Sequence, residues 1–366
     1  MIAVRNKPKV LLALSGGIDS TVALAILQNK GYKVSAITFV IPSFGKKRRR
    51  SGPPQRPPDY IEHARRAARI LGVAHQVVEA AGLFKAKVFD YFRKEYEAGR
   101  TPNPCIKCNQ LFKFELLERE ARRRGYDLVA TGHYAKISAS KGRKRFYIRE
   151  ACDRKKDQSY FLAFLPQRIL AKTIFPLGGM RKKDVGAQAE KAGLKIENRK
   201  ESQEICFIDG HYTGYLEGPV RGRQRGGLIC DRSGAVLGDH DDIRGFTIGQ
   251  RKGLGISHRE PLYVTAIDRK TNNITVGTKK ETMKRGVIVR DLHWQRYQLL
   301  NKRVEAYCKI RYGHKKAKAS IFRRGQDELE VLFKKKQVAP TPGQAAVFYE
   351  RGSIIGGGWI ERVIDE

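Results

Sequence analysis

The stretch KVLLALSGGIDSTVALAIL, residues 9–27, determines the fold class of this 366-residue chain. It begins with an apolar run that suits a buried strand of a parallel sheet. Ser15, Gly16 and Gly17 follow as a turn, and residues 19–30 then have the composition of a helix. Two glycines let the backbone approach a ligand closely, and the helix N-terminus directs unpaired N–H groups to the same place. The unit therefore predicts a binding site for phosphate groups.

The side chains of this turn add donors and a carboxylate. Ser15 and Ser20 supply hydroxyls, while Asp19 suits either a helix cap or a magnesium ligand. The turn contains no lysine and matches neither the Walker A pattern nor G-x-G-x-x-G. It is a different kind of pyrophosphate cradle.

Strands and helices alternate through the first half of the chain. Apolar segments at 33–40, 75–78 and 127–134 read as strands, and 59–71 reads as a helix. This alternation predicts an α/β domain with a parallel sheet. After about residue 205, short β segments separated by glycines predict an all-β region, a barrel.

The chain is strongly basic, with 73 Lys and Arg against 37 Asp and Glu and a net charge of +36. Such a charge favours a polyanion partner, and nucleic acid is the first candidate; the alternative is a merely basic surface. Six cysteines scattered through a long chain favour a reducing, cytoplasmic location. No stretch is apolar enough to predict a membrane span, and the apolar N-terminal run reads as a strand and not as a signal peptide.

A loop is expected at 41–59, where five prolines and the basic run KKRRR at 46–50 interrupt the alternation. The composition predicts a mobile loop, with a lid as one possible role. The basic run is typical of a solvated surface, with a localisation signal as the alternative.

The motif TPNPCIKCN, residues 101–109, places Cys105 and Cys108 two residues apart. The spacing alone is compatible with half of a zinc site, a redox pair, cluster ligands or nucleophiles. No further Cys/His pair at zinc-ligand spacing accompanies it.

The string SGGIDS resembles the PP-loop ATP pyrophosphatase superfamily, whose members cleave ATP between the α and β phosphates and adenylate a substrate oxygen. Further motifs, in order, make the chain similar to the tRNA-specific 2-thiouridylase family: GRTPNPCIKCNQLFKF (99–114), ATGHYA (130–135), KDQSYFL (156–162), SQEICFI (202–208), FTIGQRKGLGI (246–256), IRYG (310–313) and TPGQAAVFY (341–349).

The resemblance implies a PP-loop catalytic domain at 1–204, a small central domain at 205–282 and a C-terminal β-barrel at 283–366. It implies ATP-dependent 2-thiolation of the wobble uridine of tRNA, with magnesium and a sulfur-donor protein, either a persulfide relay protein or a cysteine desulfurase. The implied ATP contacts are Ala13, Leu14, Ser15, Gly16, Gly17, Ile18, Asp19 and Ser20, with Val40 and Gly132 on the adenosine side. The implied contacts to the target base and tRNA are Asn103, Pro104, Cys105, His133, Lys156, Asp157, Gln158, Arg311, Tyr312 and Gln344.

The resemblance also gives roles to the cysteines. Cys108 matches the family's nucleophile and Cys206 its persulfide carrier, while Asp19 serves pyrophosphate release. Basic surroundings and a helix starting near Cys108 predict a lowered thiol pKa. Cys105 departs from the commoner pattern, which has Asp there. Cys105, Cys108 and Cys206 could therefore instead hold a [4Fe–4S] cluster. A structural or zinc role for Cys105 is the third alternative. Cys152, Cys230 and Cys308 are expected to be dispensable packing residues.

Two functions of other classes remain open. A PP-loop ligase for a small metabolite would need neither the +36 charge nor a C-terminal barrel. A non-catalytic RNA-binding module stabilised by a structural zinc ion would need a second pair of Cys or His ligands.

Overall fold

The computed structural model describes residues 7–42, 59–194, 206–208, 212–216, 226–300 and 302–365. The basic run at 46–50 and most of the expected loop at 41–59 lie outside these ranges. The chain forms two compact units. The first comprises 1–88, 105–207 and 352–354, and the second comprises 89–104, 208–351 and 355–366.

A five-stranded parallel sheet forms the centre of the first unit, in the order β3-β2-β1-β4-β7. Its strands are β1 (Lys9–Ala13), β2 (Lys33–Val40), β3 (His75–Glu79), β4 (Leu128–Thr131) and β7 (Thr173–Ile174). Val10 of β1 lies between Val34 of β2 and Leu128 of β4. The sheet positions the phosphate loop, because that loop leaves the carboxyl end of its central strand.

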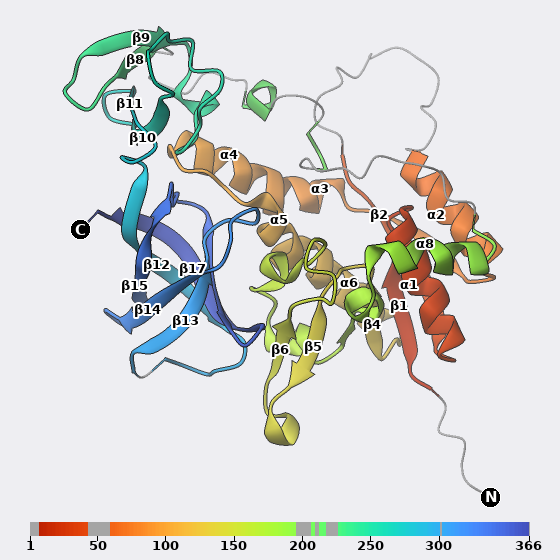
Figure 1. Ribbon diagram of the computed structural model, residues 1–366. Coiled ribbons are helices and arrows are strands. Elements are labelled where there is room, and N and C mark those ends of the chain that lie inside the picture. Colours follow the sequence, from red (N-terminus) through yellow and green to blue (C-terminus); the bar gives the residue numbers. More distant parts are fainter. Residues whose placement is uncertain are drawn as a thin grey trace, which may run out of the picture. The chain divides into compact units, whose positions relative to one another are not determined.

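Helices cover both faces of this sheet (Figure 1). Val10, Leu12 and Leu14 pack with α1 (Ile18–Asn29), α2 (Asp59–Ile70) and α8 (Lys182–Lys191). Leu11, between them in sequence, packs on the other face with Leu117 and Ala121 of α6 (Phe114–Arg123). Successive side chains of a strand point to opposite faces, so one short apolar run supplies both cores.

Shorter elements complete the first unit. A hairpin of β5 (Lys136–Ala139) and β6 (Phe146–Arg149) follows β4. The remaining helical segments are α3 (Ala81–Phe84), α5 (Pro104–Lys107), α7 (Gln167–Leu170), the π-helices η1 (Lys85–Phe89) and η2 (Cys108–Lys113), and the 3₁₀ turns η3 (Lys141–Arg143), η4 (Ser159–Leu162) and η5 (Pro176–Gly179).

The second unit contains α4 (Asp90–Glu97), 3₁₀ turns η6 (Tyr212–Tyr215) and η7 (Ile243–Gly245), and two sheets. The smaller sheet has the order β10-β11-β8-β9, formed by β8 (Gly227–Cys230), β9 (Val236–His240), β10 (Tyr263–Asp268) and β11 (Asn273–Gly277). The other is a closed barrel: β12 (Met283–Trp294), β15 (Glu328–Val338), β14 (Ala317–Arg323), β13 (Val304–Lys309), β16 (Ala345–Glu350) and β17 (Ser353–Ile364), closed by pairing of β12 with β17.

The predicted fold class is confirmed. The strands expected at 33–40 and 75–78 and the helix expected at 59–71 lie within one residue of β2, β3 and α2. The all-β region after residue 205 contains the expected barrel. Among the described helices, none has the length and apolarity needed to cross a membrane.

Gly16 gives a first testable prediction. It has a φ of +75°, and a Cβ there would lie 2.1 Å from the backbone oxygen of Tyr60 in α2. Gly72 has a φ of +62° with nothing within 4 Å of an added Cβ. Gly72→Ala should lower the free energy of unfolding by about 1–2 kcal/mol, the cost of the left-handed conformation alone. Gly16→Ala should cost about twice that amount, because backbone must also move.

Urea unfolding followed by circular dichroism at a helix wavelength measures both variants against the unsubstituted protein. Equal losses would contradict the close packing of Gly16 against Tyr60.

Candidate functional site

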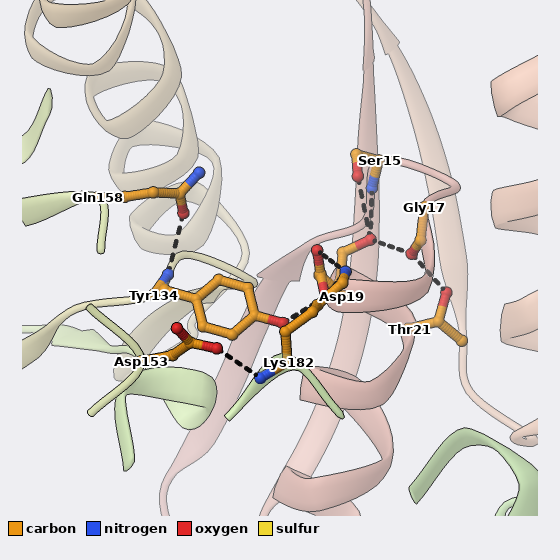
Figure 2. Close-up of polar contacts among 9 residues, drawn as sticks. Ser15, Gly17, Asp19, Thr21, Tyr134, Asp153, Gln158 and Lys182 are labelled. Carbon is orange, nitrogen blue, oxygen red and sulfur yellow. Dashed lines mark hydrogen bonds and ion pairs between the residues drawn. The ribbon is translucent and has the colours of Figure 1, made fainter. Parts of the chain in front are cut away.

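Hydroxyl groups hold the turn between β1 and α1 (Figure 2). Ser20 Oγ donates to the carbonyl of Gly17 at 3.0 Å and accepts the backbone N–H of Ser15 at 3.1 Å. Ser15 Oγ lies 3.1 Å from Ser20 Oγ, and Thr21 Oγ1 donates to the carbonyl of Gly17 at 3.0 Å. The loop is thus shaped before any ligand binds.

The N-terminus of α1 is open to an anion. Gly17 is its N-cap and makes no side-chain capping bond, so the first-turn N–H groups of this 12-residue helix are left for a ligand. A Cβ on Gly132 would lie 2.8 Å from the backbone nitrogen of Ser20. Gly132 therefore brings the end of β4 directly against the start of α1. These features fit the phosphates of ATP.

The residues expected around ATP share one edge of the sheet. Ala13 ends β1, Val40 ends β2, and Gly132 follows β4 directly. The three strands are parallel neighbours, so their carboxyl ends lie side by side. Ligands of open α/β sheets bind at this edge.

Asp19 is paired and does not cap its helix. Both carboxylate oxygens accept from Lys182 Nζ, at 2.7 and 2.8 Å, and Oδ1 also accepts from the Tyr134 hydroxyl at 2.6 Å. The carboxylate lies in the first turn of α1 and is 31% exposed. Its position and oxygen chemistry suit a magnesium ligand once Lys182 releases it.

Cys105 and Cys108 lie within one continuous helical run. Cys105 is in α5, Cys108 begins the π-helix η2, and α6 follows at Phe114. Cys105 and Cys108 are partly buried, while Cys206 is exposed. All three belong to the first unit, and the charge of Cys206 affects the pKa of both others.

The expectation of a lowered thiol pKa for Cys108 is wrong. Burial raises the pKa of Cys108 to about 11 and, with the neighbouring thiols, that of Cys105 to about 12. Burial by surrounding protein atoms raises the pKa of Cys206 as well. The positive charge of Lys113 lowers all three without offsetting burial, and the helical run begins at Pro104 and not at Cys108.

The cysteines do not fit a cluster in this arrangement. In the part of the chain that the structure describes, no group of three His, Cys, Asp or Glu residues is placed to hold a metal ion.

His133 faces inward. Its Nδ1 lies 2.7 Å from Thr131 Oγ1, and its ring packs against Phe114 and Phe175. Burial, followed by the charge of Lys113, holds its pKa well below the usual value, so the ring is neutral at pH 7.

Asp157 and Gln158 also bond within the first unit. Asp157 accepts the N–H of Ala151 at 2.9 Å and the hydroxyl of Ser159 at 2.6 Å, while burial raises its pKa. Gln158 Oε1 accepts the N–H of Tyr134 at 3.0 Å. Lys156, beside them, is half-buried.

Gln344 supports the segment before the cysteines. It is buried, and its Nε2 donates to the carbonyls of Thr101 and Pro102 at 3.0 Å each. Asn103 Nδ2 donates to Gln344 Oε1 at 3.5 Å. Gln344 thereby positions Asn103, the residue before Pro104.

Arg311 forms a hydrogen bond inside the second unit, whereas the neighbouring Tyr312 is exposed. Arg311 Nη2 donates to Thr341 Oγ1 at 2.7 Å. Tyr312 is 38% exposed, and Lys309 Nζ lies 5.2 Å from its ring centroid. An exposed aromatic ring with a cation beside it suits stacking on a nucleic-acid base.

The other cysteines are not all packing residues. Cys308 is buried in the barrel core and Cys230 is half-buried in β8. Cys152 is exposed, and Lys136 Nζ donates to its sulfur at 2.9 Å. The expectation of packing is wrong for Cys152.

Sequence reasoning missed Lys113, Tyr134 and Lys182. Tyr134 lies inside the quoted motif ATGHYA, and Lys113 inside the cysteine motif, so proximity to those motifs could have indicated them. Lys182 is one lysine in the run RKKD, and no local signal distinguishes it.

The fold and the loop define a PP-loop protein with appended β domains. Three family models match in succession: the tRNA methyl transferase HUP domain over residues 8–210, the tRNA methyl transferase PRC-barrel domain over 216–278, and the Aminomethyltransferase beta-barrel domain over 284–360. A protein of Geobacter metallireducens named tRNA-specific 2-thiouridylase MnmA is 41% identical, covering 99% of each chain. Proteins of the same name from Syntrophotalea carbinolica and Treponema denticola are 42% and 40% identical over 97% of this chain, and cover 99% and 98% of their own lengths. The chain belongs to the tRNA-specific 2-thiouridylase family.

The raised thiol pKa of Cys108 gives a second prediction. Below a pKa of about 11, the thiolate fraction rises tenfold per pH unit. The rate at which iodoacetamide alkylates Cys108 in the free protein should therefore rise about tenfold per unit from pH 7 to pH 10. Lys113→Met should slow alkylation at each pH, because it removes the cation that lowers the pKa.

Peptide mass spectrometry after timed quenching measures the rate at each site. Lys107→Met, which removes an equal charge from the same helical run, is the control. A rate that levels off near pH 8 would contradict the raised pKa.

Proposed function

We propose that this protein thiolates the C2 position of the wobble uridine of tRNA in an ATP-dependent reaction. The observation that carries the proposal is the presence, in one unit, of a PP-loop with an open helix N-terminus and of the thiols of Cys105, Cys108 and Cys206. The relatives that align over the whole chain carry the name of that activity.

The PP-loop would serve activation of the base. The C2 oxygen of uracil is a poor leaving group, so it must be activated before sulfur can replace it. Its attack on the α-phosphate of ATP forms a bond to AMP and releases pyrophosphate. The N–H groups of α1 and the hydroxyls of Ser15 and Ser20 would stabilise that departing charge. Magnesium, held by Asp19, would supply further neutralisation of the phosphates.

The cysteines would supply the sulfur. The terminal sulfur of a Cys206 persulfide attacks C2, the C–O bond breaks, and AMP leaves with its electron pair. Cys108 thiolate then attacks Cys206 Sγ, which releases the thiolated base and leaves a Cys108–Cys206 disulfide. A dithiol reductant must restore both thiols after each turnover. In the alternative order, Cys108 attacks the persulfide first and releases hydrogen sulfide, which attacks C2.

The raised thiol pKa values fit a site that is unreactive without substrate. Protonated Cys108 would not attack solvent oxidants readily, since thiolate is the nucleophile. Lys113 is the cation that favours the thiolate of each cysteine. A persulfide donor protein would load Cys206, which is the most exposed residue of the three.

Contacts to tRNA are proposed for each unit by itself, and in the first unit they are His133, Lys156, Asp157 and Gln158. In the second unit, Tyr312 offers an exposed ring and Arg311 a cation. Gln344 would act by holding Asn103 and Pro104 at the base. The net charge of +36 favours binding to the tRNA phosphates. The boundaries 1–204, 205–282 and 283–366 and a cytoplasmic location belong to the same proposal.

Methyl transfer and small-metabolite ligation are less well supported. The family models carry the description methyl transferase, but the usual methyl donor, S-adenosylmethionine, has no phosphate for the helix terminus to bind. A small-metabolite ligase shares the PP-loop but gives no role to a barrel or to three thiols.

The third prediction tests the proposed sulfur transfer. A transcript tRNA with uridine at the wobble position is incubated with ATP, magnesium and a persulfide donor, and its nucleosides are analysed by mass spectrometry. Cys108→Ser and Cys206→Ser should each reduce thiolation at least about 100-fold, because each removes a nucleophile. Cys230→Ser, in the second unit, is the matched control and should retain activity.

Cys105→Asp with iron analysis separates the cysteine relay from a cluster. The relay requires activity in preparations that contain no iron. Dependence of thiolation on reconstituted iron, lost in Cys105→Asp, would refute the relay.

The fourth prediction concerns ionic strength. Raising salt from about 50 to 200 mM should weaken tRNA binding at least about 100-fold, because bound phosphates release counterions. Equilibrium binding of labelled tRNA measures the slope. A transcript duplex of equal length is the control for binding to phosphates alone. An affinity for tRNA that does not change with salt would contradict the role given to the net charge.

A further inference from the structure

The phosphate loop lacks a cation of its own. Its six residues, SGGIDS, contain no lysine or arginine, and Asp19 places a negative charge in the first turn of α1. A bare carboxylate there would repel the phosphates that the helix N-terminus attracts. Without magnesium, a positive charge near the loop must therefore come from another part of the chain.

Lys182 supplies that charge. Its Nζ donates to both oxygens of Asp19, at 2.7 and 2.8 Å, and lies 5.9 Å from the ring centroid of Tyr134 (Figure 2). The Lys182 and Asp19 side chains are 26% and 31% exposed, so solvent and ligands reach the pair. An ion pair of this exposure is weak enough to exchange partners.

The fold fixes the backbone position of Lys182, while the ammonium at the end of its side chain can still move. Lys182 is the first residue of α8, and its backbone N–H donates to Asp153 Oδ2 at 2.9 Å. Val185 and Ala189 anchor α8 in the core that also contains α1. From this fixed origin, four methylene groups let the ammonium move between Asp19 and a phosphate oxygen bound at the same helix N-terminus.

We propose that Lys182 is the cation of the nucleotide site, neutralising Asp19 in the free protein and transferring to the phosphate oxygens when a nucleotide triphosphate binds. The inference rests on the proposed use of ATP and assigns a residue to that site. Lys182 is thus a positioning residue for the phosphates, in place of the lysine that other phosphate loops carry within the turn.

Nucleotide binding without tRNA tests the inference. The probe is α,β-methylene-ATP, which cannot be cleaved at the bond that the proposed reaction breaks, titrated calorimetrically with EDTA present. Lys182→Met should weaken binding about 10- to 100-fold, the loss expected for a charge-assisted contact. Lys182→Arg should keep most of the affinity. Lys183→Met removes an equal charge from the next, exposed position of α8 and should bind as the unsubstituted protein does.

A double variant distinguishes a shared cation from a structural ion pair. Asp19→Asn combined with Lys182→Met should bind the probe more tightly than Lys182→Met alone, because no unpaired carboxylate then faces the phosphates. This double variant also leaves no unpaired charge to impair folding. The comparison with Asp19→Asn alone separates the two roles. A merely structural ion pair predicts equal affinity for the double variant and Asp19→Asn, whereas a lost phosphate contact leaves the double variant about 10- to 100-fold weaker.

The outcomes separate the inference from the proposed function. Unchanged affinity in Lys182→Met, or equal affinity of the double variant and Asp19→Asn, overturns the role of Lys182 and leaves the proposed function standing. Failure of the unsubstituted protein to bind the probe, with magnesium as well as with EDTA, overturns the proposed function and this inference with it.

Discussion

The phosphate loop depends on two places where backbone lies against backbone with no space for a side chain. Gly16 packs on the carbonyl of Tyr60 at the start of α2, and Gly132 packs on the first turn of α1 at Ser20. These approaches fix the N-terminus of α1 relative to the sheet and to α2. Because α1 is fixed, Asp19 has a defined position, and the Tyr134 hydroxyl and Lys182 ammonium can converge on it.

Local patterns in the sequence predicted the sheet and the phosphate loop, because the residues that form each element are contiguous in the sequence. The strand and helix pattern at 9–27 is of this kind. The pairing of Lys182 with Asp19 joins residues 163 positions apart, and the bonds from Gln344 to Thr101 join residues 243 apart. Asp19, Thr101 and Gln344 lie in motifs, but nothing in those motifs indicates which distant residue each one contacts. Such contacts follow from tertiary packing, so periodicity and spacing could not reveal them.

The thiols illustrate how local desolvation outweighs global charge. Basic surroundings and a helix starting near Cys108 predicted a lowered thiol pKa, yet burial raises the pKa of Cys105, Cys108 and Cys206. Surface charges are spread over a large area and are screened by salt within about 10 Å, whereas removal of water acts directly on the sulfur. The positive charge of Lys113 lowers the pKa of Cys108, but by less than burial raises it.

The π-helix η2, Cys108–Lys113, contains one residue more than a regular helix would need to join its two ends. A π turn spans i to i+5 and so accommodates one residue more than an α turn. Loss of one residue between Asn109 and Phe112 would let the run continue as a regular α-helix. The five remaining steps of about 100° each turn the helix about as far as the six steps of the π segment did, so Cys108 would keep its direction relative to Phe114, which is anchored in the core. Loss of one residue from α6 has no π turn to absorb it, and with Leu117 held in the core it would rotate Cys108 by about 100° around the helix axis.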